Sequence, residues 1–170
     1  MENELEKGDV LLTYNKVNFI SKLIQDVTNG PSHAMVYVGD GKVAEASVGG
    51  VQISKLSKYT HSSHYEIEVL RYNKMTNYIF MSIYEYYILN KHKRYAYLQL
   101  FIDFLFIKLH LKPRRIYDIK NAFVCSEFVA KAFRYAGVKL FKESEYGIVS
   151  PKMIEDLIGK SFRKISWSKR

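Results

Sequence analysis

The chain has 170 residues, with 26 basic residues against 17 acidic ones, and its formal net charge is +9. This length is typical of one domain, and 48% apolar with 25% charged residues excludes general disorder. The single cysteine excludes a disulfide scaffold and a cysteine-rich metal site. We therefore expect residues 1–170 to form one folded domain, whose cysteine is either a buried core thiol or a reactive one.

The positive charge is spread along the chain, with dense patches at residues 91–94, 112–115 and 163–170. Such patches suit anionic lipid or an acidic polymer, but no arginine stripe with interleaved aromatics occurs, so nucleic acid is not an expected partner. Residues 1–7 are acidic and polar and do not begin a signal peptide. The most apolar run, residues 95–111, is too short and polar for a membrane span of about 20 residues and favours a buried helix. The sequence predicts a cytoplasmic protein.

Strand patterns dominate the first half of the chain. A short apolar run after Gly8-Asp9 indicates a buried strand, and the spacing of apolar residues at 17–27 indicates an amphipathic helix. A break at residues 29–32 follows, and Gly39-Asp40-Gly41 is a hairpin signal between two apolar segments. Strands are predicted at residues 10–12, 33–38, 42–46, 51–53 and 65–72.

The second half of the chain is predicted to be helical. Residues 75–89 and 96–109 form aromatic-rich helical patterns, and residues 122–135 show helical apolar spacing followed by Gly137 as a stop signal. Ser150-Pro151 is a typical helix start, with serine as N-cap and proline at the first helical position. Strands first and helices later predict an α+β fold in which helices cover one face of an antiparallel sheet.

Cys125 lies near the start of the predicted helix at residues 122–135. There the positive end of the helix dipole and unpaired backbone N–H groups favour a thiolate. The same N–H groups can stabilise the oxyanion that forms when a thiolate attacks a carbonyl. Position alone favours a small buried core side chain, which is the commonest role of a free cysteine.

A nucleophilic cysteine needs a base, and the five histidines differ in their surroundings. His92 lies in a basic loop and His110 at a helix end, where both are expected to be solvated. His61 and His64 flank two serines in a polar loop, but no further metal ligands accompany them. His33 opens an apolar strand after a Pro-Ser turn, which fits either a core histidine or a catalytic base.

Three parts of the sequence together resemble one family. Residues 8–12 (GDVLL) and 32–46 (SHAMVYVGDGKVAEA) resemble the N-terminal half of the permuted papain-like amidases of the YaeF/YiiX type, a circularly permuted branch of the NlpC superfamily. Residues 125–138, which begin CSEFVA, resemble the nucleophile helix of that family, and residues 149–157 resemble its closing helix. The histidine precedes the cysteine, whereas ordinary papain-like enzymes have the cysteine first, and this order marks the permutation.

The resemblance implies a circularly permuted papain-like α+β fold, with Cys125 as nucleophile, His33 as base and Glu45 as orienting group. It implies a cysteine-dependent amidase or peptidase that acts on a cell-wall-type or γ-glutamyl peptide through a thioester, without a metal or organic cofactor. The alternatives are a lipid acyl hydrolase or acyltransferase with the same site, and a non-catalytic basic module that binds anionic lipid or nucleic acid. The expected partners are an amide- or acyl-containing substrate, anionic in keeping with the basic surface, and membrane lipid. Residues 95–109 are expected to line the pocket or contact lipid.

Strand parity in the predicted hairpin decides whether Glu45 can reach His33. A two-residue turn at Asp40-Gly41 pairs Val38 with Val43 and sends Glu45 to the face away from His33. A three-residue loop at residues 39–41 pairs Val38 with Lys42 and places Glu45 on the His33 face as a diagonal neighbour. The glycine that ends this loop suits the left-handed conformation required there. We therefore predict the three-residue loop and a contact of roughly 3 Å between the Glu45 carboxylate and the His33 ring.

Overall fold

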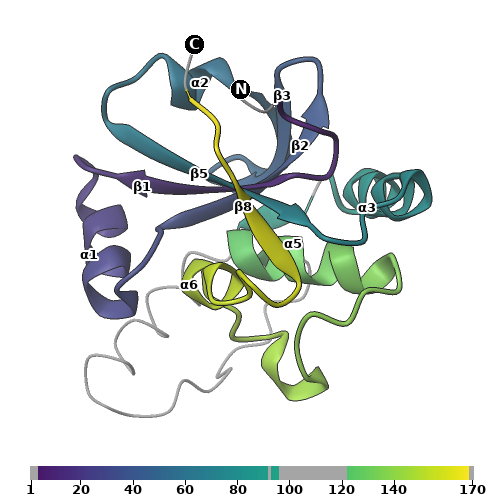
Figure 1. The fold of residues 1–170 in the computed structure, drawn as a ribbon. Helices are drawn as coiled ribbons and strands as arrows, with labels where there is room; N and C mark the ends of the chain where they lie inside the picture. Colours follow the sequence, from purple (N-terminus) through teal and green to yellow (C-terminus); the bar gives the residue numbers. More distant parts are fainter. Residues whose placement is uncertain (1–3, 92, 96–121, 169–170) are drawn as a thin grey trace.

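A six-stranded antiparallel sheet organises the chain, in the order β4-β3-β2-β1-β5-β8 (Figure 1). The structure is a computed structural model, and it describes residues 4–91, 93–95 and 122–168. Sequential strands are neighbours except where β5 returns beside β1 and β8 closes the other edge. The strands are β1 (Val10–Asn15), β2 (His33–Gly39), β3 (Lys42–Ser47), β4 (Gly50–Lys55), β5 (Tyr65–Tyr72) and β8 (Phe162–Ile165).

Helices cover both faces of this sheet, but unequally. Helices α3, α5 and α6 share one large core with the sheet, and the short helix α2 packs on the opposite face (Figure 1). A two-stranded parallel pair, β6 (Arg94–Tyr95) with β7 (Ala122–Phe123), leads into α5. The helices are α1 (Phe19–Thr28), α2 (Ser57–Thr60), α3 (Asn77–Asn90), α5 (Cys125–Tyr135) and α6 (Pro151–Glu155), with a 3₁₀ turn at Glu143–Glu145.

Side-chain alternation along the strands produces two hydrophobic clusters. Leu12 and its same-face neighbours pack against Phe128 and Phe133 of α5, and each fully buried phenylalanine contributes roughly 2–3 kcal/mol. Leu11 points to the other face, where a smaller cluster includes Tyr59 of α2. The α+β prediction is confirmed for α3, α5 and α6, while the covering of the second face by α2 was not expected from the sequence.

Most predicted elements are present with shifted ends. The predicted helix at residues 122–135 begins only at Cys125, because Ala122–Phe123 pairs with β6 instead. Ser150 caps α6 by accepting a hydrogen bond from the Met153 N–H, as its sequence pattern predicts. The predicted helix at residues 96–109, with its expected pocket-lining role, lies outside the described residues. In the described part of the chain, no helix is both long and apolar enough to cross a membrane.

The β2–β3 turn corrects the predicted loop length. Lys42 pairs with Gly39 and not with Val38, so the turn has two residues and not three. Asp40 (φ 51°) and Gly41 (φ 64°) both adopt the left-handed conformation. Two consecutive left-handed residues define a type I′ turn, whose twist matches that of the flanking strands.

A bulge at Val38 nevertheless restores the predicted register. Beyond the irregularity, Val36 lies opposite Ala44, as it would after a three-residue loop. The extra residue in β2 compensates for the shorter turn, because a bulge places two residues opposite one. Glu45 therefore shares the face of His33.

A buried ion pair ties the start of β1 to the end of β5. The Arg71 Nε donates to Asp9 Oδ1 at 2.8 Å, and its Nη2 donates to Asp9 Oδ2 at 2.9 Å. Glu6 and the backbone carbonyl of Glu4 accept the remaining hydrogen bonds of the guanidinium. Asp9 and Arg71 are both buried, so this bidentate ion pair holds β1 and β5 together from inside the protein.

Candidate active site

His33 is held at the first position of β2 by the turn before it. Asn29 ends α1 in the left-handed conformation, which redirects the chain towards the sheet. The Ser32 N–H and hydroxyl both donate to the Thr13 carbonyl, at 2.9 and 3.1 Å. These bonds fix the backbone directly before His33, whose side chain keeps 16% of its surface exposed.

Cys125 is the first residue of α5, and its side chain is almost completely buried. Val124 precedes the helix and provides no side-chain cap, so the N–H groups of the first turn are not occupied by a capping side chain. The backbone N–H groups of Ala34 and Ser126 donate to the Cys125 sulfur. Strand β2 and the start of α5 thus both direct hydrogen-bond donors at the thiol.

Cys125 and His33 are hydrogen-bonded to each other. Because Nε2 of His33 faces Glu45, the ring uses Nδ1 for this bond. Burial lowers the pKa of His33, but the charge and hydrogen bond of Cys125, and then those of Glu45, raise it to about 10. Burial raises the pKa of Cys125, but His33 and then the two backbone N–H groups bring it below its ordinary value. Both shifts favour the thiolate and imidazolium form of the pair.

The Glu45 carboxylate lies on β3 and is fully buried, and both of its oxygens accept hydrogen bonds. Its Oε2 accepts from His33 Nε2 at 2.5 Å and from the Tyr59 hydroxyl at 2.6 Å. Its Oε1 accepts from the Ser54 hydroxyl at 2.5 Å, and the Lys58 ammonium lies 3.6 Å away. Three hydrogen-bond donors and one nearby ammonium hold this buried carboxylate in a single orientation.

These donors also set the protonation of the group. Burial raises the pKa of Glu45, but the hydrogen bond and charge of His33, and then the hydroxyls of Ser54 and Tyr59, lower it to about 2. Burial and the neighbouring Glu45 charge raise the pKa of Tyr59, which remains a protonated donor. The Tyr59 and His33 rings lie nearly parallel, with centroids 6.2 Å apart. Tyr59 thus contacts both the carboxylate and the ring that it orients.

The structure brings the three residues singled out in the sequence into one hydrogen-bonded chain, and the predicted contact between Glu45 and His33 is confirmed. His61 and His64 are exposed and take no part, while His92 and His110 lie outside the described residues. Two further participants were not identified in the sequence, Ser54 and Tyr59. Ser54 could have been found from strand parity, because it is a same-face diagonal neighbour of Glu45 on β4.

Comparison with known proteins gives a structural relative. No protein-family model matches the sequence, and no curated protein matches it either. The fold is similar to the crystal structure of a protein described as metalloprotein yiiX from Escherichia coli O157:H7. The two share 19% sequence identity over 95% of this chain and 88% of that chain, with a TM-score of 0.60. This likeness shows a yiiX-like mixed α+β fold.

Proposed function

We propose that this protein is a cysteine-dependent amidase or peptidase that works through a thioester intermediate. The observation that carries the proposal is the chain of hydrogen bonds from Cys125 through His33 to Glu45. In it, a nucleophile at a helix start, a base and an orienting carboxylate stand in the order that thiol catalysis needs. We assign these three residues the roles of nucleophile, general acid-base and positioning group.

The reaction follows from the protonation states of the site. The Cys125 thiolate attacks the amide carbonyl carbon, and the carbonyl electrons move onto oxygen, where N–H groups at the start of α5 stabilise the negative charge. The imidazolium of His33 gives its Nδ1 proton to the amine as the C–N bond breaks, leaving a thioester. Neutral His33 then takes a proton from water, which attacks the thioester and releases the acid and the thiolate. Glu45 stays ionised throughout.

The proposal includes the permuted papain-like architecture and a peptide amide as substrate. The order of the elements supports it, since the strand with His33 precedes the helix with Cys125 in the chain. The resemblance of the motif segments to permuted amidases favours a cell-wall-type or γ-glutamyl peptide. The net charge of +9 suits an anionic substrate of this kind.

The site residues do not fit a resident metal ion, although the structural neighbour is described as a metalloprotein. Cys125 and His33 are hydrogen-bonded to each other, and both oxygens of Glu45 are taken by protein donors. Within residues 4–91, 93–95 and 122–168, no group of three or more His, Cys, Asp or Glu side chains is arranged to hold a metal. The proposed mechanism therefore contains no step through a metal.

A mass-spectrometric trapping experiment tests the function. The protein is incubated with activated peptide-amide and acyl-ester probes, and intact mass is measured for wild type, Cys125→Ser, His33→Ala and the matched exposed control His61→Ala. We expect an acyl adduct on wild type and on His61→Ala, a strongly slowed adduct on His33→Ala, and no thioester on Cys125→Ser.

Two outcomes would contradict the proposal. One is an adduct that persists in Cys125→Ser, which would place the reactive group elsewhere. The other is no reaction with any probe, together with salt-dependent binding of an anionic polymer that Cys125→Ser leaves unchanged, which would indicate a non-catalytic module.

A further inference from the structure

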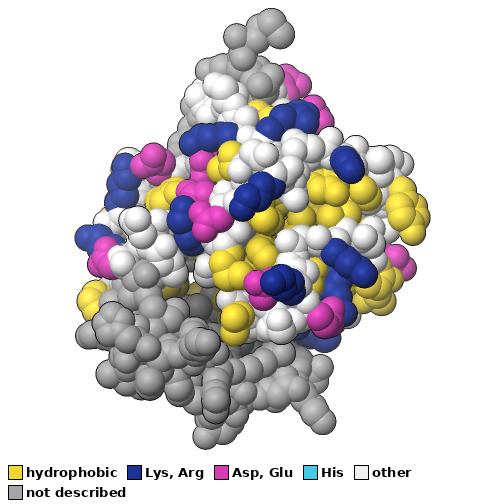
Figure 2. All heavy atoms as spheres, turned by 60° about the horizontal axis from the view of Figure 1, so that its bottom comes forward, with side chains coloured by type: hydrophobic (Ala, Val, Ile, Leu, Met, Phe, Trp, Pro, Cys, Tyr) yellow, Lys and Arg dark blue, Asp and Glu magenta, His cyan; other side chains and the backbone are white. Residues whose placement is uncertain are grey.

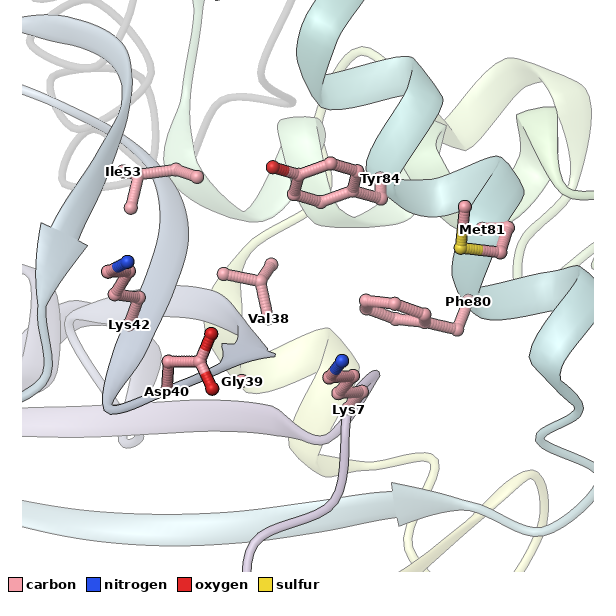
Figure 3. Close-up of a pocket in the computed structure, with 9 residues that line it drawn as sticks. All are labelled: Lys7, Val38, Gly39, Asp40, Lys42, Ile53, Phe80, Met81 and Tyr84. Atoms are coloured by element: carbon pink, nitrogen blue, oxygen red, sulfur yellow. The ribbon is translucent and has the colours of Figure 1, made fainter.

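The hairpin of β2 and β3 has a different environment at each of its two ends. At the turn end, a cavity of about 410 Å³ is lined by apolar side chains together with Lys7, Lys42 and Asp40 (Figure 3). The exposed Glu85 directly follows the lining residue Tyr84 on α3. Figure 2 shows basic, acidic and hydrophobic side chains interspersed over the described part of one face of the molecule. The charges of the cavity therefore favour neither an anion nor a cation, whereas the catalytic end of the hairpin holds an ordered row of polar side chains.

Gln52 on β4 lies at the centre of this row. It is directly opposite Glu45 in the β3–β4 ladder, so the two side chains share one face of the sheet. The Gln52 Nε2 donates to the Oγ atoms of Ser47 and Ser54, both at 3.4 Å. Ser54 in turn donates to Glu45 Oε1 at 2.5 Å. A continuous chain of hydrogen bonds thus runs from Gln52 through Ser54 and Glu45 to the His33 ring.

The direction of these hydrogen bonds follows from the hydrogens that are available. The ionised Glu45 carboxylate can only accept, so the single hydroxyl hydrogen of Ser54 is used on it. The Ser54 oxygen can then only accept from Gln52, which must present its NH₂ group and not its carbonyl oxygen. An amide NH₂ group has two hydrogens, one for each serine. Gln52 therefore keeps the Ser54 hydroxyl directed at Glu45.

The turn between β3 and β4 leaves space for this amide. Gly49 is not among the glycines with a left-handed backbone, so the conformation of the turn does not require a glycine there. A Cβ atom at this position would lie only 2.6 Å from the Gln52 Oε1, which is closer than side-chain contacts allow. The absence of a side chain at Gly49 thus makes room for the amide, and this observation is independent of the hydrogen bonds.

We propose that Gln52 is a positioning residue of the active site, which acts on His33 through Ser54 and Glu45. Ser54 is only partly buried, so without Gln52 its hydroxyl can rotate towards solvent. Glu45 then loses one of the donors that lower its pKa and hold it against the His33 ring. The expected effect on turnover rests on the proposed function, but the effect on Glu45 is a property of the folded protein alone.

Three variants test the role of the amide. Gln52→Met keeps the length of the side chain and removes its hydrogen bonds. Gln52→Glu replaces the donor by an acceptor, which draws the Ser54 hydrogen away from Glu45 and brings a second negative charge beside it. Gly49→Ala displaces the Gln52 amide, which is the end of a flexible side chain, at little cost to the fold.

Two controls are matched to these variants. Gln25→Met removes an amide that likewise donates two hydrogen bonds, to the carbonyl groups of Asn15 and Ser21. Val48→Ala changes the 81% exposed neighbour of Gly49 in the same turn.

The pKa of Glu45 is measured by carboxyl ¹³C NMR over the pH range in which the protein stays folded, and kcat and KM are measured on the probe that the wild type turns over. We expect Gln52→Met and Gly49→Ala to raise the Glu45 pKa by about 0.5, and Gln52→Glu to raise it by more than about 1. The value of kcat should fall about fivefold in the first two variants and further in Gln52→Glu, with KM within about twofold of wild type. Both controls should match wild type.

A double variant decides whether Gly49 acts through the amide. Gly49→Ala should have no further effect in the Gln52→Met background. An equal effect of Gly49→Ala in both backgrounds, or a Glu45 titration that Gln52→Met leaves unchanged, would overturn the proposal. The titration needs no turnover, so a shifted titration in a protein that turns over no probe would refute the proposed function and support the role of Gln52.

Discussion

Two of the buried carboxylates in this protein, Asp9 and Glu45, each face a cation, and the two cations differ in whether they can lose their proton. Asp9 pairs with Arg71, which stays charged at any physiological pH and whose pKa the hydrogen bond with Asp9 raises further. Glu45 pairs with His33, which can gain and lose a proton and holds the Cys125 thiol at its other nitrogen. We therefore expect a structural role for Asp9 and, on the proposed function, a positioning role for Glu45.

The neighbours of the two cations reinforce the difference. The described hydrogen bonds of the Arg71 guanidinium are all accepted by the acidic N-terminal segment, namely by Asp9, Glu6 and the Glu4 carbonyl. These hydrogen bonds do not connect Arg71 to Cys125 or His33. His33 instead joins the Glu45 carboxylate on one side to Cys125 on the other and keeps part of its surface exposed. Four predictions separate the two roles, beginning with the largest effect.

The strongest contrast is expected in catalysis. On the probe that the wild type turns over, Cys125→Ser should lower kcat by about 10⁴-fold or more, because the thiolate has no substitute at that position. The free energy of unfolding should change little, since serine is close to cysteine in size. Asp9→Asn should leave the kcat of the folded fraction within a few-fold of wild type. A large loss of kcat in folded Asp9→Asn would contradict the purely structural role expected for Asp9.

The free energy of unfolding should show the opposite contrast, with a large loss when Asp9 is replaced. Asp9→Ala leaves the Arg71 guanidinium buried without its main partner and should lower the free energy of unfolding by about 3–5 kcal/mol. The exposed pair Lys16–Glu66 is the matched control, and Glu66→Ala should cost less than about 1 kcal/mol. Denaturant unfolding measures both. Equal small losses would mean that the Asp9 pair does not stabilise the sheet.

The Glu45 contribution to stability should depend on pH in a defined direction. Folding lowers the pKa of Glu45 from its ordinary 4.5 to about 2, so its stabilising contribution is complete above pH 4.5 and is lost as the pH falls through 2. Glu45→Gln should therefore be less stable than wild type by about 3 kcal/mol at neutral pH, and the difference should shrink in acid. A difference that stays constant with pH would show that folding does not lower the pKa of Glu45.

The smallest effect is expected at Tyr59. Tyr59→Phe removes one hydrogen bond to the Glu45 carboxylate and should lower the free energy of unfolding by about 1.5–3 kcal/mol. The exposed Tyr78→Phe serves as control and should change it by less than about 0.5 kcal/mol. Tyr59→Phe should also raise the acid midpoint of the Glu45 titration. An unchanged midpoint would remove Tyr59 from the group that orients His33.

The sequence was sufficient to predict what depends on local pattern. Strand alternation, the helix signals and the motif segments identified Cys125, His33 and Glu45, and parity arguments predicted the contact between the last two. The hairpin turn was predicted with the wrong length, because the bulge at Val38 leaves no local signal and compensates for the short turn.

The remaining features depend on contacts between distant segments. Helix α2, which carries Tyr59, is four residues long and too short to show a helical period. The pairing of Asp9 with Arg71 joins segments 62 residues apart, and neither residue reveals its partner in the sequence. Strand β8 was missed for the same reason, since only its pairing with β5 identifies it as a strand.

The central claim is that Cys125 is a thiolate paired with the His33 imidazolium, and the ultraviolet absorbance of the thiolate tests it without requiring a reagent to enter the site. The difference between wild type and Cys125→Ser is recorded against pH, with His33→Ala and the control His61→Ala in parallel. We predict thiolate absorbance in wild type and His61→Ala at neutral pH and well into the acid range, and its loss at neutral pH in His33→Ala. Absorbance that appears only as the pH rises through the ordinary thiol value of 9.0, and equally in His33→Ala, would contradict the account.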